Sequence, residues 1–287
     1  MGSIAIVTDS MVRFTGSGVP GGSPVTIAPM RIRLGAEVLD DGDGPELQRL
    51  FPANGGPRSA PTPLPPSAEA LAEIYSRLHR QASHILSIHA SSRLTGTVAN
   101  ARIACQQFLG RCDIQVIDSQ SLSVGQGLLV EAAARAVARG ESFDEVVRIV
   151  RGMIPRLYMV FFLEELTYLE RLGRLSRSQA ILGEMLGIIP LLTLEEGDVI
   201  PMEKVRSRVR AVEKLVEFVS EFAELDHLAI LESSPAPSEE SQLIAERLQA
   251  LHPHAPLTIS SYSASVATCI GPSSLGVVVL EGEEPPH

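Results

Sequence analysis

The first half of the chain alternates short apolar runs with helix-like segments, and this alternation limits the fold more than any other feature. Ile4–Val7, Ser83–Ile88 and Asp113–Ile117 are short, largely apolar runs of the kind that form buried strands. A polar turn follows each of them, and segments with helical spacing separate them. Strands that alternate with helices favour a parallel sheet with helices on both faces. We therefore expect an α/β fold with a mostly parallel sheet in this half.

A second series of elements begins at Leu157–Leu163, an uncharged apolar and aromatic run that is typical of a central strand. We therefore predict an N-terminal α/β domain over residues 1–155, a C-terminal α/β domain over 156–280 and a disordered tail over 281–287. The further elements expected in the second half are a β-hairpin over 190–194 and 199–202, helices over 205–224 and 239–251, and strands over 228–231, 257–260 and 276–280.

Composition limits the partners that the chain can have. The 287 residues carry a net charge of −10, and no basic run interrupts the sequence, so nucleic acid is not an expected partner. No apolar run approaches the roughly 18–20 residues of a membrane span. Cys105, Cys112 and Cys269 lack metal-type spacing, which predicts no metal site and a reducing compartment. Because the first residues also lack the features of a signal peptide, we expect a cytoplasmic protein.

Polar side chains follow two of the predicted strands. Asp9 and Ser10 come after the first strand, and Asp118 and Ser119 come after Asp113–Ile117. In open α/β sheets, ligands bind at the carboxyl ends of the strands, so these residues are candidates for a binding site. The alternative is that they form Asp/Ser turns or helix caps.

The stretch His89–Thr97 lies between a predicted strand and a predicted helix over 98–109. A helix start has unpaired backbone N–H groups and the positive pole of the helix dipole, so it suits an anion. Hydroxyls of Ser91, Ser92 and Thr95 would add donors, and Gly96 would let a ligand approach the backbone. The alternative is that Thr95 or Thr97 only caps the helix.

Three further features are ambiguous on the sequence alone. Arg174 follows a glycine at a helix break, where its guanidinium either holds a carboxylate or phosphate or is a surface or capping side chain. The proline-rich segment Pro52–Pro66 excludes a helix and a central strand, and forms either a loop excursion or a wall beside a site. His84 and His89, on or beside a strand, are interpreted as structural histidines, and the spacing indicates no Ser-His-Asp group.

Taken together, the motifs resemble the DegV family, the bacterial fatty-acid-binding proteins, over nearly the whole chain. The similar segments are Val7-Thr8-Asp9-Ser10, Thr62-Pro63-Leu64-Pro65, Ser91-Ser92-Arg93-Leu94-Thr95-Gly96-Thr97, Ile117-Asp118-Ser119 with Gly125 and Gly127, Leu166 and Leu169 with Gly173-Arg174-Leu175-Ser176, then Pro190, Gly197 and Val205-Arg206. One departure is Cys269-Ile270-Gly271-Pro272-Ser273, where the family has His-Thr-Gly-x-Gly.

The resemblance implies two α/β domains of the DegV type, also called the EDD fold, with one long-chain fatty acid in a cleft between them. It implies that Thr62, Thr95 and Arg174 contact the carboxylate. Secondary candidates for the site are Asp9, Ser10, Ser91, Ser92, Gly96, Asp118, Ser119 and Cys269. No cofactor and no metal are implied.

The resemblance also implies a carrier rather than an enzyme. Family members present the acyl carboxylate to a separate ATP-dependent fatty acid kinase, which makes acyl phosphate for phospholipid synthesis, and transient contact with a membrane surface stays open. One alternative is a carrier for another amphiphile, suggested by the departure at Cys269. The other is an acyl or phosphoryl hydrolase that uses serine and aspartate at the strand ends, which would need a general base near a serine.

Overall fold

The computed structural model describes residues 3–16, 25–42, 49–51, 61–163, 165–166, 170, 176, 178, 183 and 185–283. The chain divides into two compact units. The first unit comprises residues 1–41, 62–155 and 196–198, and the second unit comprises residues 42–61, 156–195 and 199–287. Gly173 and Arg174 lie outside the described residues, as do 52–60 of the proline-rich segment and 284–287 of the tail.

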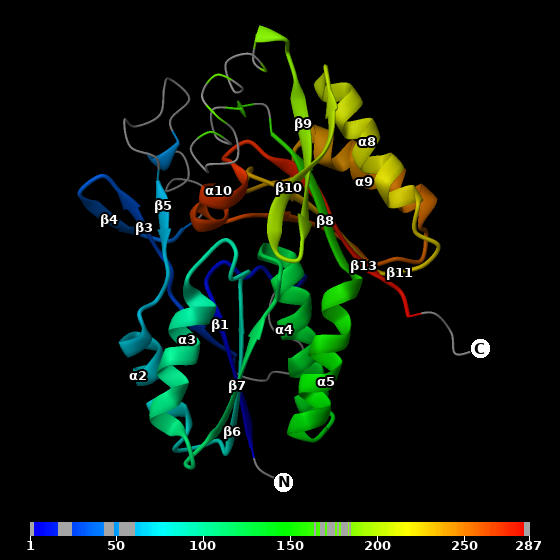
Figure 1. Ribbon diagram of the computed structural model, residues 1–287. Helices are drawn as coiled ribbons and strands as arrows, with labels where there is room; N and C mark the ends of the chain where they lie inside the picture. Colours follow the sequence, from blue (N-terminus) through cyan, green and yellow to red (C-terminus); the bar gives the residue numbers. More distant parts are fainter. Residues whose placement is uncertain are drawn as a thin grey trace. The chain divides into compact units, whose positions relative to one another are not determined.

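The first unit is built on a parallel sheet, as the sequence predicts, and this sheet has four strands. Its strands, in the spatial order β2-β1-β6-β7, are β2 (Val25–Ala28), β1 (Ile4–Asp9), β6 (His84–His89) and β7 (Asp113–Asp118). Neighbouring strands run parallel throughout, so their carboxyl ends share one edge of the sheet. Figure 1 shows α2 (Ala68–Leu78) and α3 (Thr97–Cys105) on one face, and α4 (Ser123–Ala138) and α5 (Phe143–Met153) on the other.

Helices α2 and α3 close one face of this sheet with small and aromatic side chains. Tyr75 of α2 and Ala101 of α3 pack in one cluster with Val7 and Ile85 of the sheet. The predicted helix over 98–109 is α3 followed by a 3-10 turn at Gln106–Phe108. It ends as expected at a glycine, Gly110, whose φ of 74° is left-handed.

A small antiparallel sheet carries the end of the proline-rich segment. Its order is β4-β3-β5, with β4 at Glu37–Asp40, β3 at Arg31–Leu34 and β5 at Thr62–Leu64. β5 is an edge strand and pairs with a neighbour on one side only. Pro63 is tolerated there because proline has no amide hydrogen, and an edge strand can lack a donor on its unpaired side. Ile32 is buried on one face of this sheet, whereas Arg31 and Arg33 are exposed on the other.

The second unit has a six-stranded mixed sheet in the order β10-β9-β8-β13-β11-β12. The strands are β8 (Leu157–Phe162), β9 (Ile189–Glu195), β10 (Asp198–Val205), β11 (Leu225–Glu232), β12 (Leu257–Ser261) and β13 (Leu275–Glu281), and the helices include α8 (Arg208–Ser220), α9 (Glu239–Leu251) and α10 (Ala264–Ile270). β11 and β12 are parallel, whereas β8 pairs antiparallel with β9 and β13.

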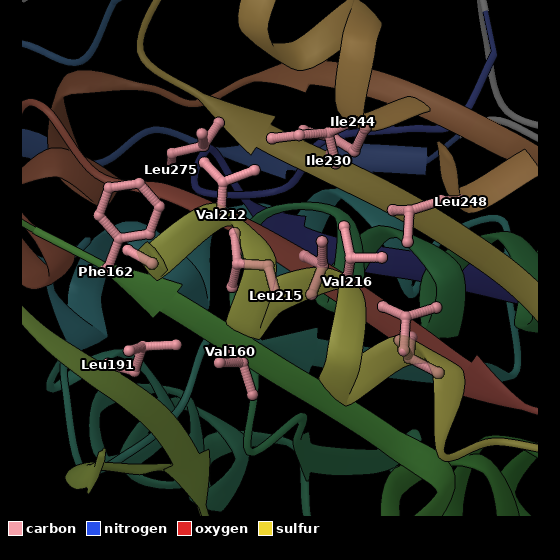
Figure 2. Close-up of a cluster of buried hydrophobic side chains, with 14 of the residues drawn as sticks. Val160, Phe162, Leu191, Val212, Leu215, Val216, Ile230, Ile244, Leu248 and Leu275 are labelled. Atoms are coloured by element: carbon pink, nitrogen blue, oxygen red, sulfur yellow. The ribbon is translucent and has the colours of Figure 1, made fainter. Parts of the chain in front are cut away.

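Helix α8 supplies the centre of the second unit's core. Figure 2 shows Leu215 and Val216 among side chains of the sheet and of α9, including Val160, Ile230 and Leu248. The predicted β9–β10 hairpin forms, and its turn residues Glu196 and Gly197 both have positive φ, as two-residue hairpin turns prefer.

Three details of the second half differ from the sequence-based expectation. The helix expected over 205–224 begins later, because Val205 is buried as the last residue of β10. Helix α10 was not expected. Glu281, expected in the tail, is the last residue of β13.

Within the described residues, none of the helices combines the length and apolar character needed to cross a bilayer.

Candidate functional site

The carboxyl edge of the first unit's sheet contains a buried aspartate with four hydrogen-bond donors around it. Asp9, at the end of β1, has no exposed surface. Its Oδ2 accepts from the Ala90 amide at 3.0 Å and lies 3.0 Å from His89 Nδ1. Its Oδ1 accepts from the Met11 amide at 3.2 Å and from Gln126 Nε2 at 3.1 Å. Asp9 therefore connects β1, the loop after β6 and α4.

The other ring nitrogen of His89 continues this network into the core. His89 Nε2 lies 2.7 Å from Ser87 Oγ, and the same oxygen lies 2.8 Å from the Tyr75 hydroxyl. Burial raises the pKa of Tyr75 well above its ordinary value, so the phenol stays protonated.

The sequence interpretation missed this Ser-His-Asp group. Ser87 and His89 are two residues apart on one strand and so share a face of the sheet, which is the one local signal for the group. The contact of His89 with Asp9 depends on the pairing of β6 with β1. Because Ser87 has no exposed surface and its oxygen already faces Tyr75, the group does not present a nucleophile to a substrate.

The two serines at the strand ends both form hydrogen bonds within the protein. Ser10 Oγ donates to Asp41 Oδ2 at 2.8 Å and accepts from the Met30 amide at 2.9 Å. Ser119 Oγ donates to the Ser121 carbonyl at 3.0 Å. The Ser119 contact fits the turn interpretation, whereas Ser10 joins the end of β1 to Met30 and Asp41, which are 20 and 31 residues further along the chain. In the described part of the chain, neither serine has a histidine among its hydrogen-bond partners.

The side chain of Asp118 accepts hydrogen bonds from two backbone amides. Asp118 Oδ1 accepts from the amides of Ser92 at 3.2 Å and Gln120 at 3.0 Å. The Ser92 residue itself is exposed. Asp118 thus ties the loop after β6 to the turn after β7.

Ser91 organises the loop before α3. Its hydroxyl donates to the Gly197 carbonyl at 2.6 Å and accepts from the Arg93 amide at 3.1 Å. Its carbonyl accepts from the amides of Leu94 at 3.1 Å and Thr95 at 3.0 Å. The Ser91 hydroxyl is therefore engaged within the first unit.

The start of α3 has glycine at its cap position. Gly96 is the N-cap residue, so no side chain caps the helix there. Thr95 is 7 % exposed, and its Oγ1 donates to Thr97 Oγ1 at 3.1 Å and accepts a long bond of 3.4 Å from the Thr97 amide. Neither threonine occupies the N-cap position that the capping alternative required.

The proline-rich segment reaches the start of α3. A Cβ atom at Gly96 would lie 3.4 Å from Cγ of Pro65. Asn100 of α3 donates its side-chain amide to the Pro66 carbonyl at 2.8 Å. The strand that carries Thr62 therefore leads directly to the loop that carries Thr95.

Thr62 has a cationic neighbour that the sequence interpretation did not single out. Thr62 pairs with Arg33 in the antiparallel β3–β5 ladder, so their side chains share a face. Both residues are exposed, as is Arg31 on the same face. The alternation Arg31-Ile32-Arg33 was the signal available in the sequence.

Arg174, the predicted cation, lies outside the described residues, and Cys269 is buried in α10 of the second unit. Among the residues that the structure describes, no group of three or more His, Cys, Asp or Glu side chains could hold a metal ion.

A comparison with known protein families shows which family the chain is related to. Residues 3–282 match the model of the family described as "Uncharacterised protein, DegV family". The chain belongs to the DegV family. A DegV domain-containing protein of Streptomyces coelicolor is 31% identical over 278 residues, which cover 96% of this chain and 98% of that protein. The resemblance seen in the sequence is therefore confirmed.

Solved structures of DegV proteins share the fold. A Thermus thermophilus DegV family protein, described by its fatty acid binding, is 26% identical, with a TM-score of 0.80 and coverage of 98% of this chain and 100% of that one. The Streptococcus pneumoniae Fatty Acid Kinase (Fak) B3 protein, loaded with linoleic acid, is 20% identical, with a TM-score of 0.83 and coverage of 98% and 100%. The α/β fold with a parallel sheet in the N-terminal part is confirmed.

Proposed function

We propose that this chain binds one long-chain fatty acid, with the carboxylate held by Thr62 and Thr95. The observation that carries this proposal is the start of α3, where a glycine occupies the cap position next to the Thr95 hydroxyl. Backbone amides at a helix start, together with the helix dipole, stabilise an anion. The fatty acid binding described for the 26% identical Thermus thermophilus protein supports the same ligand class.

A cation beside the two threonines would complete the carboxylate site. We propose Arg174 for this role on the family resemblance, and Arg33 provides a second guanidinium on the same face as Thr62. A guanidinium can form two parallel hydrogen bonds to a carboxylate. The secondary candidates Asp9 and Ser91 then act through the loop backbone, because their polar groups are already engaged.

The acyl chain supplies most of the binding free energy. Burying a chain of about sixteen carbons at ~0.8 kcal/mol per CH₂ yields more than about 10 kcal/mol before the costs of association. A protein that encloses such a chain retains its lipid through purification. We therefore expect the ligand to accompany the protein.

We further propose that the protein is a non-catalytic carrier that presents the carboxylate to a separate ATP-dependent kinase. A serine hydrolase would need a general base beside its serine. Among the described residues, the hydrogen-bond partners of Ser10 and Ser119 include no histidine, which favours the carrier over the hydrolase. The test combines palmitate-loaded protein with ATP and a bacterial fatty acid kinase, and traps acyl phosphate as the hydroxamate. Turnover of a p-nitrophenyl ester by the protein alone would instead favour the hydrolase.

Thr95→Val is expected to weaken palmitate binding about tenfold. Valine keeps the shape of threonine but removes the hydroxyl, whose hydrogen would turn from Thr97 Oγ1 to the carboxylate when the fatty acid binds. A lost hydrogen bond to a charged group costs about 1.5 kcal/mol or more. Titration calorimetry of delipidated protein with palmitate measures the change. Thr26→Val on β2, a strand position with the same chemical change, is the control and should bind like the wild type. Equal affinity of Thr95→Val and wild type would contradict the assignment of Thr95.

A further inference from the structure

We infer that four buried side chains form a hydrogen-bond relay, in which every bond is donated in the same direction, from Tyr75 through Ser87 and His89 to Asp9. The relay holds the first residue of the loop over 90–96 in place. This makes Asp9 and His89 positioning residues for the carboxylate site, an inference that rests on the proposed function. All four residues have no exposed surface. The relay runs from α2 through β6 to the end of β1, with contacts of 2.8, 2.7 and 3.0 Å.

Counting hydrogens determines the direction of each bond. The protonated Tyr75 phenol donates to Ser87 Oγ, so the single hydroxyl hydrogen of Ser87 is directed to His89 Nε2. His89 Nε2 is then an acceptor, and the ring carries its hydrogen on Nδ1, which donates to Asp9 Oδ2. Every hydrogen in the chain has an acceptor in this order.

The opposite order leaves buried groups unsatisfied. With the hydrogen on His89 Nε2, the Ser87 oxygen would accept from the ring, and either the Ser87 hydrogen or the phenol hydrogen would then have no acceptor among the described residues. The Nδ1 lone pair would also face the Asp9 carboxylate. A buried polar group without a partner loses its hydration and gains no hydrogen bond in exchange, which disfavours this arrangement.

The Asp9 carboxylate connects the relay to the binding loop. Its two oxygens have four donors around them, of which one is the Ala90 amide. Ala90 directly precedes Ser91, whose carbonyl accepts from the Thr95 amide at 3.0 Å. The position of Thr95 therefore depends on a chain of hydrogen bonds that begins inside the core.

A pair of variants at His89 separates positioning from structural support. His89→Asn puts an amide donor near the place of Nδ1, whereas His89→Gln puts its amide near the place of Nε2. Both lose the ring, so a purely structural role predicts equal losses. The relay predicts palmitate affinity within about threefold of wild type for His89→Asn and a fall of about tenfold or more for His89→Gln, because only the former keeps the charge-assisted bond to Asp9. Equal affinities of the two variants would overturn the inference.

Two measurements without ligand keep this test separate from the proposed function. In nitrogen-15 NMR of histidine-labelled protein, His89 should carry its hydrogen on Nδ1 and an unprotonated Nε2. Asp9→Asn should speed hydrogen exchange at the Ala90 amide at least about tenfold, because the asparagine cannot accept from all four donors. If the wild type binds no palmitate, the proposed function fails but these results still decide the relay. A hydrogen on Nε2, or unchanged exchange at Ala90 in a folded Asp9→Asn protein, would overturn it.

Discussion

Gly127→Ala is expected to destabilise the protein by more than about 3 kcal/mol, because the added methyl group would overlap backbone atoms that cannot move aside. A Cβ atom at Gly127 would lie 1.8 Å from the Arg13 carbonyl oxygen and 2.8 Å from its carbon. The Arg13 backbone is held there by a 3.1 Å hydrogen bond from its amide to the Ser123 carbonyl. The glycine thus allows α4 to pack directly on the segment after β1.

Urea unfolding measures this effect, since a loss of stability lowers the midpoint without changing the slope. Gly152→Ala in α5 is the matched control, because a Cβ atom there would meet no atom of another element within 4 Å in the described part of the chain. Alanine favours a helix over glycine by up to ~1 kcal/mol, so the control should be as stable as the wild type or slightly more stable. A Gly127→Ala midpoint equal to that of the wild type would contradict the predicted overlap.

Gly197→Ala is expected to cost about 3 kcal/mol and to weaken palmitate binding as well. Gly197 has a φ of +80°, where a side chain strains the backbone by about 1–2 kcal/mol. Its Cβ atom would also lie 2.4 Å from Ser91 Oγ and 3.2 Å from the Cα atom of Gln120. The Ser91 hydroxyl would have to leave the Gly197 carbonyl, which disturbs the loop that holds Thr95.

Gly187→Ala separates backbone strain from overlap. Gly187 also has a positive φ, of 60°, but a Cβ atom there would have no neighbour within 4 Å among the residues that the structure describes. This control should therefore show only the strain of about 1–2 kcal/mol. Thermal unfolding and palmitate titration of both variants give the comparison. If Gly187→Ala lowered stability and palmitate affinity as much as Gly197→Ala, the role given to the Ser91 contact would be wrong.

Local patterns in the sequence were sufficient to predict three strands of the first unit's parallel sheet, β1, β6 and β7. Ile4–Val7 and Ser83–Ile88 are largely apolar on both faces because helices cover both faces of the parallel sheet (Figure 1), and this composition is visible without any long-range information. Helix α10, Ala264–Ile270, escaped prediction because all its residues are buried, so its sequence has no polar face to reveal a helical period.

The contacts at the candidate site depend on strand register, which the sequence does not display. Asp9 and His89 meet because β1 pairs with β6, and Arg33 lies beside Thr62 because β3 pairs with β5. A shift of one residue in either pairing would turn these side chains to the opposite face. Ser91 and Asp118 were identified as candidates, but only the structure shows their hydrogen-bond partners.

Mass spectrometry of an organic extract of the purified protein tests the central claim, fatty acid binding, most directly. The account predicts one long-chain fatty acid per protein molecule, with less retained by Thr95→Val than by Thr26→Val prepared in the same way. An extract that contains no acyl lipid, from a folded protein that also takes up no palmitate on incubation, would contradict it.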